Sequence, residues 1–152
     1  MPSRLATTRI EYGIEWQGVA AKDVYRRTIA DNGKGMTGDE LVQFFNIFGG
    51  GGKPIGGEHE NFGVGAKTGL MPWNHYGIVV ISWADGVGSM IRIERDEHTG
   101  EYGLRPTSVH YDDEDIVELA APLHYDAELD IDWRKIKPKW IDDHGRVLVL
   151  LE

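Results

Sequence analysis

The stretch ADNGKGM, residues 30–36, separates two segments with strand character from a segment with helix character. In RIEYGIEW (9–16), apolar side chains alternate with glycine and charged residues, which is the period of two that is typical of a half-buried strand. This alternation puts Glu11 and Glu15 on the exposed side of that strand. VYRRTIA (24–30) predicts a second strand, and we expect residues 18–23 to join the two as a hairpin.

The residues that follow the stretch predict a helix. Thr37 and Glu40 have the spacing of a capping box, and apolar residues then recur at helical intervals, so we expect a helix from about residue 38 to residue 48. Residues 49–57 are rich in glycine, which loses more backbone entropy on ordering than any other residue. This segment therefore predicts a mobile loop.

The second half of the chain predicts mostly sheet. GIVVISW (77–83) and SMIRIERD (89–96) flank a turn and predict a hairpin, with EYGLRP (101–106) as a possible third strand. GRVLVLLE (145–152) has the pattern of a buried strand. Two charged segments are interpreted as solvated connectors: YDDEDIVE (111–118), for which the cap of a short helix is the alternative, and DWRKIKPKW (132–140).

Composition limits the class of protein. With 152 residues and 41% hydrophobic content the chain predicts one domain over residues 1–152. A formal net charge of −9 argues against binding nucleic acid or an anionic membrane through overall charge. The absence of cysteine, of a long apolar run and of a signal-like N-terminus predicts a cytoplasmic protein without membrane spans.

Two common phosphate-binding motifs are excluded by spacing. A P-loop requires Gly-Lys followed by Ser or Thr, whereas Lys53 is followed by Pro54. A dinucleotide fingerprint requires G-x-G-x-x-G after a strand, whereas GVGAKTG (63–69) has one residue too many between its second and third glycines. What remains is a pair of motifs, ADNGKGM and NFGVGAKTG (61–69).

This pair resembles the ATP site of the GHKL, or Bergerat-fold, ATPase superfamily, which includes DNA gyrase, histidine kinases, large ATP-dependent chaperones and the microrchidia proteins. Asp-x-Gly-x-Gly at the end of a strand resembles its first glycine box, and FGVGAKTG resembles its second, closest to the microrchidia and chaperone types. The resemblance implies an α/β (α+β) two-layer sandwich, in which a mixed β-sheet is backed by helices. It implies that residues 49–62 form a lid over bound ATP.

The resemblance also implies which residues bind the nucleotide. Asp31 would accept a hydrogen bond from the adenine amino group, and Lys67 would place a positive charge near the terminal phosphates. Paired glycines let the backbone approach the ligand closely, and N–H groups at a helix N-terminus favour phosphate. The full set is Asp31, Gly33, Gly35 and Met36 in the first box, and Gly63, Val64, Gly65, Lys67 and Thr68 in the second.

The sequence departs from the family pattern at two places. The family carries its catalytic glutamate and its Mg²⁺-binding asparagine on a helix before the first strand, and neither residue can be assigned here, so we expect no hydrolysis by this chain. Arg146 stands where the family often has threonine near the adenine aspartate. Two interpretations stay open: an ATP/ADP-binding switch that forms a homodimer or belongs to a larger ATPase, with Mg²⁺ as a possible cofactor, or a nucleotide-free interaction scaffold. Neither predicts direct contact with nucleic acid.

Overall fold

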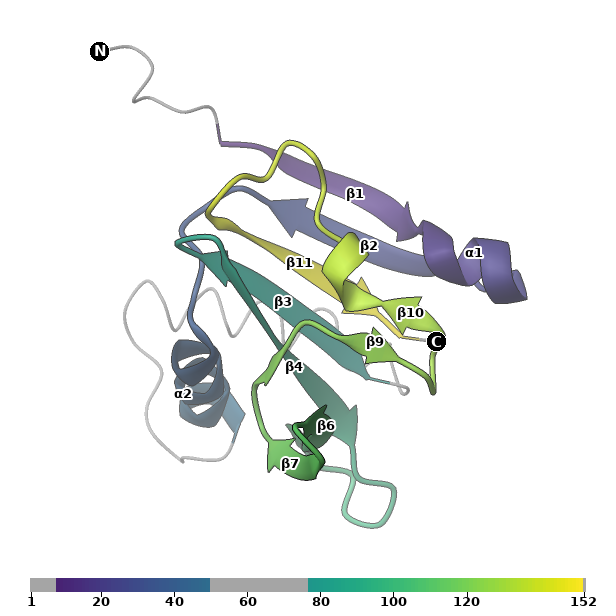
Figure 1. Cartoon of the computed structure of the whole chain (residues 1–152), viewed down its shortest axis with the longest axis vertical. Helices are drawn as coiled ribbons and strands as arrows, with labels where there is room; N and C mark the ends of the chain where they lie inside the picture. Colours follow the sequence, from purple (N-terminus) through teal and green to yellow (C-terminus); the bar gives the residue numbers. More distant parts are fainter. Residues whose placement is uncertain (1–7, 50–76, 152) are drawn as a thin grey trace.

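The computed structural model describes residues 8–49 and 77–151. Their secondary structure is strand-rich, with two α-helices near the N-terminus (Figure 1). In chain order the elements are β1 (Ile10–Glu15), α1 (Trp16–Lys22), β2 (Arg26–Asp31), α2 (Gly38–Gly49), β3 (Ile78–Ala84), β4 (Val87–Arg95), β5 (Tyr102–Leu104), β6 (Thr107–Tyr111), β7 (Glu114–Glu118), β8 (Ala121–Pro122), β9 (Tyr125–Asp126), β10 (Ile131–Asp132), η3 (Trp133–Lys135) and β11 (Gly145–Leu150).

One large sheet organises these elements. Its strands lie in the order β1-β2-β11-β3-β4-β5, and β8 adds a short pairing to β4. Figure 1 shows β1, β2, β11, β3 and β4 side by side. The predicted fold class is correct at the level of an α+β protein, but the expected mixed sheet is wrong for the described strands, all of whose pairings are antiparallel. The last strand, β11, lies between β2 and β3 and joins the N-terminal hairpin to the central one.

The two faces of this sheet pack against different parts of the chain. Alternate residues of β3, β4 and β11 pack with Leu41 and Phe45 of α2, and we call this side the α2 face. The residues between them pack with Ile131, Trp133 and Ile141, from β10 and the segment after it, and we call this side the β10 face. Burial on both faces explains why β3 and β11 are almost continuously apolar.

The predicted helix and its capping box are confirmed. The Thr37 backbone N–H donates to Glu40 Oε1 (3.1 Å) and the Glu40 N–H donates to Thr37 Oγ1 (3.2 Å), so each residue satisfies the other at the start of α2. The pKa of the Glu40 carboxyl is lowered, mainly by its hydrogen bond with the Thr37 backbone and to a smaller extent by the Thr37 side chain. The cap fixes where α2 begins, two residues after the end of the first glycine motif.

The N-terminal hairpin is confirmed, but its connection differs from the expected loop. The Glu15 side chain accepts hydrogen bonds from the N–H groups of Gln17 and Gly18, which makes Glu15 the N-cap of α1. Expecting Glu15 on the exposed face of β1 was therefore wrong. It is only 2% exposed and forms an ion pair at 3.4 Å with buried Arg26 on β2.

Both charged segments adopt local structures that their composition did not indicate. The acidic tract is a β-hairpin, β6–β7, and not the cap of a helix; Asp112 and Asp113 form its turn with positive φ angles of 43° and 71°. The later segment contains η3, which places Trp133 in the core at 0% exposure. Neither α-helix of the described residues combines the length and the apolar character that crossing a bilayer requires.

Candidate functional site

The first glycine motif lies where β2 leaves the sheet. Asp31 is the last residue of β2 and pairs in register with Arg146 of β11. The preceding pair of this register, Ala30 and Val147, packs into the core of the β10 face. Because successive side chains of a strand point to opposite faces, Asp31 and Arg146 lie on the α2 face. This is the side on which the helix after the motif packs.

The Asp31 carboxylate is held by two neighbours. Its Oδ1 accepts a hydrogen bond from the Gly33 N–H at 2.9 Å, which is a turn closed by an Asx side chain. Its Oδ2 lies 3.4 Å from Arg146 Nε, and the two side chains are 15% and 18% exposed respectively. A carboxylate offers about four lone-pair sites. These two contacts therefore leave Asp31 able to accept a further donor, such as an exocyclic amino group.

Gly35 and Met36 connect the motif to the centre of the sheet. A Cβ on Gly35 would lie 1.6 Å from the carbonyl oxygen of Trp83, so only glycine fits between the loop and β3. The Met36 N–H donates to Ser82 Oγ at 2.6 Å, and the Ser82 hydroxyl donates to the Gly145 carbonyl at 3.3 Å. The Met36 side chain packs against the apolar cluster of the α2 face. Gly35 and Met36 thus both have a structural role, in packing against β3 and in the core of the α2 face.

The second motif and most of the predicted lid lie outside the described residues. This applies to Gly63, Val64, Gly65, Lys67 and Thr68, and to lid residues 50–62. The structure therefore brings together Asp31, Gly33, Gly35 and Met36, and it leaves the expected meeting of the two motifs as a prediction.

Metal-ligating side chains are dispersed across the described part of the chain. Within residues 8–49 and 77–151, no three side chains of Asp, Glu or His gather as a group that could hold a metal ion. The expectation of Mg²⁺ is thus a proposal that depends on nucleotide phosphates, which are themselves preferred ligands of that ion.

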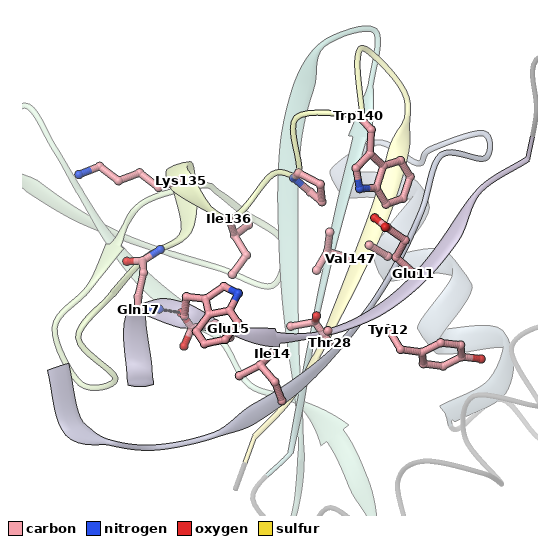
Figure 2. Close-up of a pocket in the computed structure, with 14 residues that line it drawn as sticks. Glu11, Tyr12, Ile14, Glu15, Gln17, Thr28, Lys135, Ile136, Trp140 and Val147 are labelled. Atoms are coloured by element: carbon pink, nitrogen blue, oxygen red, sulfur yellow. Dashed lines mark hydrogen bonds between the residues drawn. The ribbon is translucent and has the colours of Figure 1, made fainter. Parts of the chain in front are cut away.

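A groove of about 350 Å³ lies on the β10 face of the N-terminal hairpin, opposite the α2 face that carries Asp31 (Figure 2). β1, β2 and β11 line one wall, where Thr28, Ala30 and Val147 take part. The other wall is formed by Lys135, Ile136, Pro138 and Trp140. Ala30 and Val147 belong to the core of the β10 face, so the groove and Asp31 lie on opposite faces of the sheet. This cavity is therefore separate from the predicted nucleotide site.

One end of the groove carries an aromatic and acidic corner formed by Trp140 and Glu11 (Figure 2). The chain's own Arg9 occupies this corner: its guanidinium lies 4.6 Å from the centre of the Trp140 ring and 2.9 Å from Glu11. The sequence interpretation did not identify this groove. Its residues come from segments more than a hundred positions apart, and the only local signal was an unexplained glycine, Gly13, inside a strand.

Comparison with known proteins adds no assignment. No protein-family model matches the chain, and no curated protein matches its sequence.

Proposed function

We propose that this chain binds an adenine nucleotide through a site of the GHKL type, with Asp31 as the residue that recognises the base. The observation that carries the proposal is the state of the Asp31 carboxylate. It is largely withdrawn from solvent, oriented by the Gly33 N–H, and retains acceptor capacity on the helix-bearing face of the sheet. A carboxylate in this setting accepts the adenine amino group and repels the carbonyl that guanine presents at the same position.

The surrounding architecture is compatible with this proposal. A sheet with α2 packed on one face, and a glycine motif between β2 and α2, agrees with what the resemblance implies around the first box; the antiparallel pairing of the described strands does not. We propose the finer assignment to the Bergerat fold on that basis. The residues of the second motif would then bind the phosphates, and lid closure over them would act as a conformational switch.

Arg146 sets a limit on the affinity that we expect. Its guanidinium partly neutralises Asp31 and lies beside Gly33, 3.9 Å from where a Cβ would be. An incoming base must share the carboxylate with this cation or displace it. Replacing Arg146 by threonine removes the competitor, and we expect the R146T variant to bind nucleotide more tightly than the wild type.

The test is a calorimetric titration with a non-hydrolysable ATP analogue and Mg²⁺. A hydrogen bond to a charged group contributes about 1.5–3 kcal/mol, so Asp31→Asn should weaken binding by about 10- to 150-fold. Asp39→Asn is the matched control, because Asp39 is exposed in the first turn of α2. Equal affinity of the wild type and Asp31→Asn would refute the proposal, provided that both variants unfold at the same urea concentration.

A second candidate, a nucleotide-free interaction module, is favoured by a different observation. Three large side chains at the N-terminal end of the described chain are exposed: Ile10 (59%), Tyr12 (80%) and Trp16 (71%). Exposed apolar patches mark sites of protein contact, and Ile10 and Tyr12 lie on the same face of β1. Failure of the wild type to bind any nucleotide, together with self-association, would favour this candidate.

A further inference from the structure

The strand β1 forms one edge of the large sheet. Among the described strands it pairs with β2 alone, over six consecutive residues from Ile10 to Glu15, without a bulge (Figure 1). A regular edge strand presents a row of unpaired main-chain groups to solvent, and such a row is a template for another strand. The strand itself contains no proline or lysine, the residues that commonly protect sheet edges.

The pairing with β2 shows which main-chain groups of β1 face outwards. Asn32 donates its N–H to the Arg9 carbonyl at 3.3 Å, so Arg9 belongs to the hydrogen-bonded set of this antiparallel pair. Because hydrogen-bonded and non-hydrogen-bonded pairs alternate, the odd-numbered residues of β1 direct their main-chain groups towards β2. The outward groups therefore belong to Ile10, Tyr12 and Ile14.

We infer that two copies of this chain associate through antiparallel pairing of their β1 strands, with a two-fold axis at Tyr12. The inference does not depend on nucleotide binding. Pairing about this axis places Tyr12 opposite its counterpart and Ile10 opposite Ile14 of the second copy. Each of these is a pair whose main-chain groups face outwards, so about six inter-strand hydrogen bonds form.

Charge selects this alignment over its neighbours. Moving the axis to Glu11 would place Glu11 opposite itself, and moving it to Gly13 would place Glu11 opposite Glu15. Like charges directly opposite one another destabilise a pair of strands. With the axis at Tyr12, Glu11 faces Gly13 and Arg9 faces Glu15, so no like charges are opposed.

The same alignment joins the apolar strips of the two β1 strands, each formed by Ile10, Tyr12 and Ile14. Ile10, Tyr12 and Ile14 lie on the α2 face, because they pair in register with Asp31, Ile29 and Arg27 of β2. In the dimer, the strip from one copy continues into the strip of the other, and the aromatic rings of the two tyrosines meet at the axis. A short strand pairing buries less area than a permanent interface, so we expect an association that depends on protein concentration.

Cysteine cross-linking tests the inference, because the chain contains no cysteine of its own. Residues in a hydrogen-bonded antiparallel pair have Cα atoms roughly 5.5 Å apart, within the range that a disulfide spans. Under mild oxidation, Tyr12→Cys should form a covalent dimer. Tyr25→Cys, at a tyrosine that is 56% exposed and outside β1, should stay monomeric.

Two further variants test the alignment itself. Ile10→Cys and Ile14→Cys should each cross-link poorly alone and efficiently when the two proteins are mixed. Sedimentation of the cysteine-free protein supplies an independent measurement: the wild type should show a dimer that Tyr12→Lys abolishes, because two lysines would meet at the axis. Cross-linking of Tyr12→Cys no faster than Tyr25→Cys, or self-linking of Ile10→Cys as fast as the mixture, would overturn the inference.

Discussion

Replacing Gly35 by alanine should destabilise the fold even when no nucleotide is present. Gly35 is buried where the first glycine motif crosses β3. An added Cβ would lie 1.6 Å from the Trp83 carbonyl oxygen and 2.6 Å from its carbonyl carbon. The obstacle is backbone, so it has no side-chain rotation by which to make room.

The geometry determines the expected size of the effect. Contacts of a Cβ below 3.0 Å essentially never occur, so the loop and β3 must separate by about 1.4 Å, the difference between that limit and 1.6 Å. β3 is held on both sides by β4 and β11 and yields little. Overpacking costs about 1–3 kcal/mol and occasionally more, and we expect Gly35→Ala to cost about 3 kcal/mol.

Urea unfolding followed by tryptophan fluorescence measures this free energy directly. Gly103→Ala is the matched control, because Gly103 lies in β5 and a Cβ there would meet nothing within 4 Å. The control should be neutral or more stable by up to about 1 kcal/mol. A Gly35→Ala protein that unfolds within about 0.5 kcal/mol of the wild type would show that the glycine is not required for packing.

Three other substitutions test individual contacts by the same unfolding assay. Glu15→Gln should cost about 3–5 kcal/mol, because it leaves the buried Arg26 charge without its carboxylate, and a loss below about 1 kcal/mol would contradict this reasoning. Gln17→Ala should cost about 1–3 kcal/mol through the loss of two hydrogen bonds, at 2.8 and 3.0 Å, to the backbone of β10, and an unchanged midpoint would refute that contribution. Glu40→Gln should destabilise the protein at neutral pH; the native pKa of Glu40 is lowered, so its contribution is present above its ordinary value of 4.5 and is lost as pH falls through the native pKa. A stability difference between Glu40→Gln and the wild type that stays constant down to about pH 3 would contradict the assignment.

Residues close together in sequence allowed the local part of the site to be predicted. Asp31 was expected at the end of a strand, and the capping box was expected to start the next helix; both are confirmed. The ion pair between Asp31 and Arg146 was foreseen only as a substitution near the base, because its geometry depends on β11 pairing with β2. The groove with Trp140 required the same long-range assembly.

Signals within a few residues of one another were sufficient for the cap of α2, the β3–β4 hairpin with its turn and the apolar pattern of β11, because each depends on local backbone preferences and side-chain periodicity. Tertiary packing determined that Glu15 is buried and that Trp133 enters the core. In each case the energy comes from a partner supplied by the folded chain: a buried guanidinium or an apolar cluster. Partners distant in sequence leave no periodic signal, so only the assembled sheet shows which residues they stabilise.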